Sequence, residues 1–238
     1  MINFILKFTT SLIYRILLKI KFLRSMSQEG EDLIIDRIIQ MNNIDYKSIY
    51  YLDIGAGHPI KYSNTFYFYL RGAHGITVDG LKKNTYLHKI LRPRDISKNY
   101  IIGQNNEIVN FYLYKESELN TSNKQRKEEL EQNGIFFQST IKVRKIAIRD
   151  FFKKEIKNKS NKINFLSIDV EGTDLEIIKS INWKHFKPKI ISVEILSTNI
   201  KDIYESEIYK ILNLNGYSIS SKLFNSVIFT KNCINEKK

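Results

Sequence analysis

The feature that most constrains this chain is a short apolar run that ends at a pair of glycines. The run covers Ile49 to Ile54, and Gly55 and Gly57 follow it closely. A run of this length bounded by glycine is typical of a strand buried on both faces of a sheet. Glycine after such a strand lets the backbone turn tightly and approach a ligand. The segment therefore predicts a parallel sheet with a ligand site at its edge.

Strand-like and helical segments alternate along the rest of the chain. We expect strands at 75–78, 100–102, 109–114, 142–148, 163–168, 189–195, 217–221 and 226–230. We expect helices at 27–41 with Ser27 as N-cap, at 63–70, 173–181 and 203–214, and at 124–132 within a polar loop over 117–134. This alternation predicts an α/β fold with a mostly parallel sheet and helices on both faces. A final strand pair without a helix between its members is typical of the seven-stranded, Rossmann-like class I methyltransferase sheet.

The carboxyl ends of parallel strands meet at one edge of a sheet, where open α/β folds bind their ligands. We therefore expect the site at 53–58, 79, 103–104, 169–172 and 194. Asp79 ends the second expected strand, where an acid can accept hydrogen bonds from ribose hydroxyls. A dinucleotide fingerprint would need glycine at position 60, which is Ile60, and no P-loop is present. The pattern predicts a site for an adenosine ligand rather than for NAD.

Composition narrows the class of protein. A chain of 238 residues with 42% hydrophobic content can bury one full core, so a single domain is expected over residues 25–238. The net charge of +13 favours anionic partners such as nucleic acid, an acidic membrane surface or a phosphorylated substrate. Cys233 is the only cysteine, which excludes an internal disulfide and a zinc site with several cysteine ligands. We therefore expect a cytoplasmic protein.

Residues 1–24 differ from the rest of the chain because they contain five cations and no acid. At helical spacing they form one apolar stripe, and all five cations lie outside it. The longest charge-free run, Phe8 to Tyr14, is far shorter than the roughly 18–20 residues that span a bilayer. The segment predicts a basic amphipathic helix with two roles left open. It either contacts the inner face of an anionic membrane, or packs against this domain or a second subunit in a homodimer.

Several motifs, taken in order along the chain, resemble those of the FkbM-like methyltransferases. They are Ser27-Gln28-Glu29-Gly30-Glu31-Asp32, Asp53-Ile54-Gly55-Ala56-Gly57-His58-Pro59, Ser63-Asn64-Thr65, and Ile168-Asp169-Val170-Glu171-Gly172 with Asp174, Glu176, Trp183 and Glu194 behind it. The resemblance covers roughly residues 27 to 197. It implies a Rossmann-like fold, S-adenosyl-L-methionine as methyl donor, and transfer to a hydroxyl oxygen of a glycan or natural product.

By position, the resemblance also implies a set of cofactor contacts from the glycine loop and the polar residues around it. The expected cofactor-binding residues are Gln28, Glu31, Asp53, Gly55, Ala56, Gly57, Asn64 and Asp79. The family often has Glu-Pro-Asn after the second strand, whereas this chain has Asp79-Gly80-Leu81. The geometry of the adenosine contact is therefore left open.

Two carboxylates and a histidine are the candidate catalytic groups. Asp169 and Glu171 follow an expected strand and share one face if Val170 points into the protein. Such a pair can orient an acceptor hydroxyl, take its proton or bind a cation, and no dedicated metal site is predicted. Glu171 alternatively caps the next helix. His58 directly follows the glycine loop and titrates near neutrality, unless nearby backbone groups hold its ring.

The sequence says less about the identity of the methyl acceptor than about the cofactor. Arg92 and Arg94 would suit the phosphate of a phosphorylated or nucleotide-linked acceptor, and Glu194 is also expected near the substrate. The leading hypothesis is O-methylation of a sugar hydroxyl or similar small polar acceptor, in surface-polysaccharide or secondary-metabolite synthesis. N-methylation and methylation of a phosphorylated small molecule stay open. A non-catalytic basic module for membrane or nucleic acid also stays open, although the cations are not interleaved with aromatics as in nucleic-acid stacking sites.

Overall fold

The computed structural model describes residues 25–156, 163–197 and 199–231. Its main sheet contains β1 (Tyr50–Ile54), β2 (His74–Asp79), β3 (Ile96–Asn99), β7 (Ile163–Ile168), β8 (Ile190–Glu194), β9 (Tyr217–Lys222) and β10 (Ser226–Lys231). The helices are α2 (Glu31–Met41), α3 (Phe66–Leu70), α4 (Lys82–Leu91), α5 (Lys124–Gln132), α6 (Ile148–Phe151), α7 (Asp174–Ser180), α8 (Ile200–Glu205) and α9 (Glu207–Leu214). The predicted helix at residues 1–24 lies outside the described residues.

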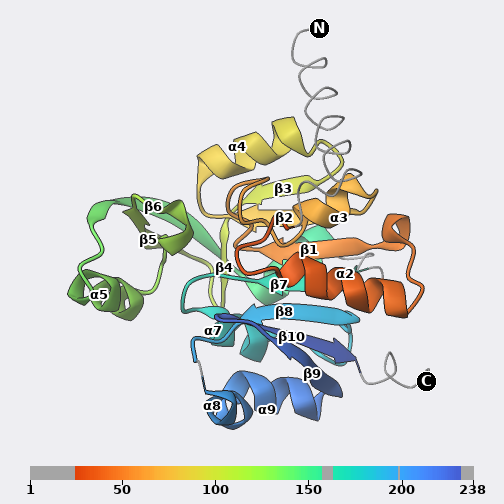
Figure 1. Cartoon of the computed structure of the whole chain (residues 1–238). Coiled ribbons are helices and arrows are strands. Elements are labelled where there is room, and N and C mark those ends of the chain that lie inside the picture. The colour runs from red at the N-terminus through yellow and green to blue at the C-terminus, as the bar shows by residue number, and fades with distance from the viewer. Residues whose placement is uncertain (1–24, 157–162, 198, 232–238) are drawn as a thin grey trace, which may run out of the picture.

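The strand order of the main sheet is β3-β2-β1-β7-β8-β10-β9. Five strands, from β3 to β8, pair in parallel, and β10 pairs antiparallel with both β8 and β9. The chain thus starts in the middle of the sheet, moves to one edge, and returns to build the other half (Figure 1). This arrangement confirms the predicted seven-stranded, mostly parallel α/β sheet of the class I methyltransferase type. Such a sheet has its topological switch point between β1 and β7, where a ligand is expected.

Strict alternation along the strands sorts side chains onto two faces. In β1, Leu52 and Ile54 face a core cluster shared with α6, α7, α8 and α9. Tyr51 faces a second cluster shared with α2 and α3, and Asp53 points to the same face. Each face is closed by helices, which is why the strands carry apolar residues on both sides. Burial on both sides fixes the register that brings the strand ends together.

A second, three-stranded sheet stands beside the main one and was not predicted as separate. It has the order β4-β6-β5, from β4 (Ile101–Gly103), β6 (Phe137–Ala147) and β5 (Glu107–Tyr114). With α5 it forms a lobe at the carboxyl edge of the main sheet (Figure 1). The strands expected at 100–102, 109–114 and 142–148 therefore exist, but they build this lobe. The lobe supplies one wall of the cleft described below.

Three local expectations differ from the structure. Helix α2 begins at Glu31 with Gly30 as N-cap, because Ser27 instead closes a turn with Asp32, whose backbone N–H donates to Ser27 Oγ (3.2 Å). The helix expected at 203–214 is broken at Ser206, whose hydroxyl accepts from the Tyr209 N–H (3.1 Å) and caps α9. Helix α4 and strand β3 were not predicted. Among the helices of the described residues, none combines the length and the apolar character needed to cross a membrane.

Candidate active site

A cleft opens at the carboxyl edge of the main sheet, where the register aligns three strand ends. Ile54 pairs with Val78 on one side and with Ile168 on the other, so the residues after these three positions meet. The cleft has a volume of about 840 Å³, its opening included. Its walls come from the loops after β1, β2 and β7, from β4 and β5, and from the segment 117–122.

The glycine loop after β1 forms the floor of the cleft. Gly55 has a φ of +83°, and a Cβ atom there would lie 1.7 Å from the carbonyl oxygen of Asp169. Only glycine fits this position, since both the backbone angle and the space exclude a side chain. The Gly55 and Ala56 N–H groups donate to the Val78 carbonyl (2.9 and 3.0 Å). The loop is therefore tied to β2 and approaches the cleft as bare backbone.

Asp79 is fixed at the end of β2 and lines the cleft. Its Oδ2 accepts from the Gly57 N–H (2.9 Å), and its Oδ1 accepts from the Leu81 N–H (2.7 Å) and from Asn84 Nδ2 (3.2 Å). Burial raises the pKa of Asp79 to about 6, because it disfavours the ionised form more than the three donors favour it. The carboxylate joins the two loops, and Oδ2 keeps a lone pair for a ligand hydroxyl.

The end of the cleft beyond Asp79 is apolar. Leu81, Ile101, Ile102 and Phe111 line it, with Tyr100 beside them. An apolar slot next to a carboxylate suits a nucleoside base attached to a ribose. Together with the bare glycine loop, this slot fits an adenosine ligand. Sequence reasoning placed the site at 103–104 and missed these residues, although Ile101 and Ile102 stood in an expected strand.

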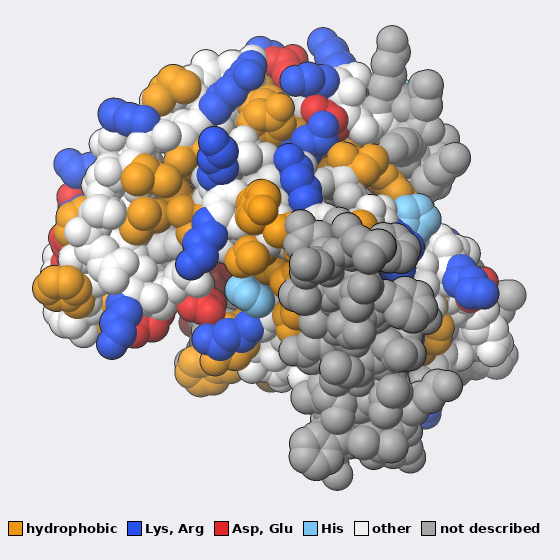
Figure 2. Space-filling view, turned by 90° about the horizontal axis from the view of Figure 1, so that it is seen from above, with side chains coloured by type: hydrophobic (Ala, Val, Ile, Leu, Met, Phe, Trp, Pro, Cys, Tyr) orange, Lys and Arg blue, Asp and Glu red, His pale blue; other side chains and the backbone are white. Residues whose placement is uncertain are grey.

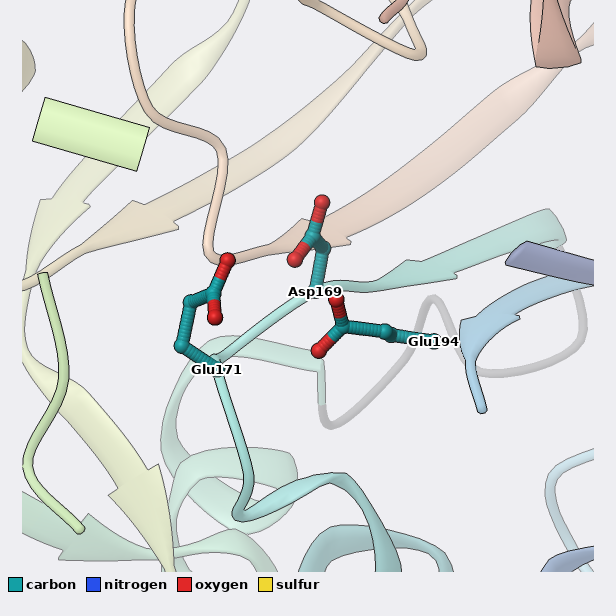
Figure 3. Close-up of side chains that lie close together, drawn as sticks. All are labelled: Asp169, Glu171 and Glu194. Atoms are coloured by element: carbon teal, nitrogen blue, oxygen red, sulfur yellow. The ribbon is translucent and has the colours of Figure 1, made fainter. Parts of the chain in front are cut away.

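Three carboxylates converge beside the glycine loop, where Asp169 and Glu171 line the cleft and Glu194 lies next to them (Figure 3). Oxygen atoms of Asp169, Glu171 and Glu194 all lie within 4.8 Å of one another, a spacing that can hold a cation or a shared proton. Arg126 of α5 pairs with Glu171 (3.2 Å). Burial and then the neighbouring Glu171 raise the pKa of Asp169 well above its ordinary value. The cluster therefore retains a proton under conditions where isolated carboxylates are ionised.

The backbone at Glu171 is strained, with a φ of +53° for a residue that has a side chain. This conformation turns the Glu171 carboxylate back toward Asp169. The alternative role for Glu171, as cap of the next helix, is not seen: the N-cap of α7 is Thr173, and no side chain of the described residues caps it. Asp174, the first residue of α7, instead accepts from the Val170 N–H (3.4 Å) and the Gly172 N–H (3.3 Å) of the preceding loop. The expected juxtaposition of Asp169 and Glu171 is present, and Glu194 at the end of β8 joins them.

Comparison with known proteins agrees with this geometry. The family model described as the methyltransferase FkbM domain matches residues 53–219. The chain belongs to the FkbM methyltransferase family. The match spans both the glycine loop and the carboxylate cluster of this FkbM methyltransferase. No curated protein sequence matches the chain.

Two solved structures resemble this FkbM methyltransferase only distantly. An O-methyltransferase from Bacillus cereus in complex with SAH shares 10% identity at a TM-score of 0.37, over 92% of this chain and 89% of that one. A precorrin-6y C5,15-methyltransferase from Geobacter metallireducens GS-15 shares 9% identity at a TM-score of 0.32, over 80% of this chain and 85% of that one. At these scores the likenesses add no argument about the site.

His58 lines the cleft of the FkbM methyltransferase, but its ring is engaged by backbone. Its Nδ1 accepts from the Ile60 N–H (3.2 Å) and the Lys61 N–H (3.1 Å). Burial lowers the pKa of His58, so the ring is neutral and carries its hydrogen on Nε2. In this arrangement the nitrogen that faces away from the backbone is a donor, which favours the alternative of a backbone-bonded histidine over a general base.

Three of the expected cofactor residues do not line the cleft. Asp53 is 3% exposed, and its Oδ2 accepts from Thr65 Oγ1 (2.6 Å) on the α3 face of the sheet. Glu31 accepts from Ser226 Oγ (2.9 Å), and Asn64 donates to Ser167 Oγ (3.2 Å). These side chains support the loops from behind. Gln28, Gly55, Ala56, Gly57 and Asp79 do line the cleft.

The two arginines expected to bind substrate also lie away from the cleft. Arg92 is fully buried and pairs with Asp95 (2.7 Å). It further donates to Thr65 Oγ1 (2.8 Å) and to the Tyr51 hydroxyl (2.8 Å). Arg94 lies over the Tyr69 ring and donates to the Tyr69 carbonyl. Arg92 has no access to a ligand, so its assignment to substrate is wrong, and Arg94 is not part of the cleft wall.

The segment 117–122 supplies cleft residues that the sequence left unassigned. Glu118, Asn120 and Ser122 line the cleft. An isolated bridge between Tyr112 and Thr121 holds the segment against β5, with hydrogen bonds of 2.8 and 3.2 Å. No local pattern in this polar stretch indicates such a contact. The expected loop with a helix at 124–132 is present, and its first part forms the wall.

A change at Glu194 is expected to alter the pH dependence of stability. Burial, followed by the charge of Asp169, raises the pKa of Glu194 to about 10, against about 4.3 in an unfolded chain. A raised pKa contributes stability that is complete below pH ~4 and declines as the pH rises toward the folded value. Glu194→Gln removes this decline. We expect its free energy of unfolding at pH ~8 to exceed that of the parent by on the order of 1–3 kcal/mol, with a correspondingly higher unfolding temperature, and the difference to be smaller at pH ~5.

Thermal unfolding at the two pH values, followed by circular dichroism, measures this effect. Glu205→Gln is the matched control, because Glu205 lies exposed on α8. This variant should unfold at the same temperature as the parent at both pH values. An equal shift for Glu194→Gln at both pH values would show that the carboxylate does not hold a proton in the folded chain.

Proposed function

We propose that the chain binds S-adenosyl-L-methionine in this cleft and methylates a hydroxyl oxygen of a small polar acceptor such as a sugar. The observation that carries the proposal is the layout of one cleft. The cleft is lined by an apolar slot, the Asp79 carboxylate and a bare glycine loop, and also by Asp169 and Glu171, beside which Glu194 lies. The first set of groups fits an adenosyl amino acid, and the carboxylates fit a hydroxylated acceptor. The polysaccharide or natural-product acceptors that the family resemblance implies belong to this class.

The residues that would hold the donor follow from their positions. Ile101 and Phe111 would flank the adenine, Asp79 would accept from the ribose, and the backbone of Gly55 to Gly57 would lie along the methionine portion. Gln28 lies on the same wall and is exposed enough to reach it. When bound, the donor supplies an activated methyl group, so the protein's main contribution is alignment of the two reactants.

The carboxylate cluster would orient the acceptor and take its proton. Because the three carboxylates lie this close, the cluster retains a proton under conditions where isolated carboxylates are ionised, so it can both accept and donate hydrogen bonds. A sugar hydroxyl needs both kinds of partner, because it donates one hydrogen bond and accepts others. An ionised carboxylate with a raised pKa is also a stronger base than an ordinary one. We assign the proton transfer to Asp169, since it lines the cleft and its carboxylate accepts no hydrogen bond from the described residues.

Titration calorimetry with S-adenosyl-L-methionine tests the donor site. We expect micromolar binding by the parent and at least tenfold weaker binding by Phe111→Ala, since burial of an aromatic contact contributes on the order of 1–3 kcal/mol. Asp79→Asn should weaken binding to a similar degree, because it removes a charged acceptor. Phe136→Ala is the control, since Phe136 is 76% exposed outside the cleft. Parent-like binding by both cleft variants would show that the donor binds elsewhere.

A further inference from the structure

Helix α4 presents a basic face that the proposed reaction does not use. Lys82, Lys83 and Lys89 are exposed along one side of the helix, and Tyr86 lies among them with 62% of its surface exposed. The opposite side of α4 is polar but buried, through Asn84, Thr85 and His88. The helix is therefore held in place by its polar side, and its cations face solvent.

The face contains no compensating acid. From Gly80 to Asn99 the only acidic residue is Asp95, and it is buried against Arg92. Within the described residues, none of the three lysines of α4 forms an ion pair. Unpaired cations that repel one another on one face are stabilised by an external anionic surface.

Apolar side chains are exposed on α4 and directly after it. Besides Tyr86, the exposed residues Pro93 and Ile96 follow α4 on the same edge of the sheet, with Ile96 39% exposed. Figure 2 looks down on this end of the molecule and shows lysine and arginine side chains spread over the surface with hydrophobic patches between them. Cations around a tyrosine and aliphatic groups are typical of surfaces that lie at a lipid headgroup layer.

We propose that the α4 face, defined by Lys82, Lys83, Tyr86, Lys89 and Ile96, docks on an anionic lipid bilayer. Charge complementarity identifies the partner, and the exposed tyrosine and isoleucine favour a lipid surface over a nucleic acid, which would need several stacked aromatics. The start of α4 borders the cleft, because Leu81 and Asn84 line it. Docking through this face brings the rim of the cleft to the membrane surface. The inference does not depend on methyl transfer.

Vesicle flotation with the full chain tests the docking surface. We expect binding to vesicles of equal parts phosphatidylcholine and phosphatidylglycerol, and little binding to phosphatidylcholine alone. The triple variant Lys82→Ser, Lys83→Ser, Lys89→Ser should bind the anionic vesicles about a hundredfold more weakly, since each cation near such a surface contributes about fivefold. The control triple Lys184→Ser, Lys187→Ser, Lys210→Ser removes the same charge from exposed positions away from α4 and should bind nearly like the parent.

Residues 1–24 carry five further cations and are present in every variant, so their contribution is constant across the comparison. Equal losses in the two triple variants would overturn the proposal, because net charge alone would then explain binding. Tyr86→Ser should weaken binding several-fold in addition. Tighter binding of polyuridylate than of anionic vesicles, lost in the α4 triple variant, would also overturn it and assign the face to nucleic acid.

Discussion

Replacing Asp169 with asparagine is expected to lower the turnover of methyl transfer by roughly 10²–10⁴-fold, the usual contribution of a general base. Affinity for S-adenosyl-L-methionine should change little, because asparagine keeps the shape of the side chain and the backbone carbonyl that lies against Gly55. The loss arises because the amide cannot take the proton of the acceptor hydroxyl. Turnover of the parent should rise with pH, since burial raises the pKa of Asp169 and the ionised form is the base.

Two measurements distinguish a catalytic base from a structural residue. They are the single-turnover rate with a hydroxylated acceptor and the donor affinity by calorimetry. Glu176→Gln is the matched control, because Glu176 is an exposed acid on α7 a few residues away and does not line the cleft. Glu171→Gln should raise KM for the acceptor more than it lowers turnover, because Glu171 is already paired with Arg126. Turnover of Asp169→Asn within threefold of the parent would remove Asp169 from the proton transfer.

The sheet and the ends of its strands could be predicted because their signals are local. Apolar runs of strand length stop at glycine or acid, and the strands then align by burial on both faces. Gly55, Gly57, Asp79, Asp169 and Glu171 all lie directly after such runs. Because these strands pair in parallel, their carboxyl ends lie at one edge of the sheet. The residues that follow the strands therefore lie close together. Glu194 joins the cluster for the same reason.

The orientation of Asp53 could not be predicted, although its position could. In β1 every residue is buried, so hydrophobicity does not alternate and gives no sign of which face each side chain takes. The structure pairs Asp53 with Thr65 on the α3 face. The carboxylate closest in sequence to the glycine loop is therefore a support of the loop and not a wall of the cleft.

Helix α4 was not predicted from the sequence, for a different reason. Its buried side is formed by Asn84, Thr85 and His88, so the apolar stripe that normally marks a helix is absent. Its cations instead suggest a solvated basic stretch, and Arg92 at its end was expected to bind the phosphate of an acceptor. Tertiary polar contacts explain why this helix packs: Asn84 with Asp79 (3.2 Å), His88 with the Gly57 carbonyl (3.2 Å), and the network around Arg92 at its C-terminal end. A fully buried arginine is rare, and nothing local distinguishes it from an exposed one.

Removing the carboxylate that pairs with Arg92 should strongly reduce stability. Asp95→Ala is expected to destabilise the chain by about 3–5 kcal/mol, because it leaves the Arg92 guanidinium charged and without its paired carboxylate in the interior. Asp95 also accepts from the Tyr51 hydroxyl (2.7 and 2.8 Å) and from the Gly75 N–H (3.0 Å), and these donors would lose their partner. For a domain of this size the melting temperature should fall by roughly 10 °C.

Thermal and denaturant unfolding measure this loss, with Glu128→Ala as control. Glu128 pairs with Lys124 on the exposed side of α5 (3.6 Å), and removing it should cost less than about 0.5 kcal/mol.

The effect of Asp95→Ala should also reach the cleft. Arg92 holds Thr65 and the Pro59 carbonyl (3.3 Å), which follow the glycine loop in the chain, so donor affinity of the folded fraction should weaken. Unfolding of Asp95→Ala within 2 °C or so of the parent would mean that Arg92 finds other partners. The buried pair would then not be what holds α4 and the loop together.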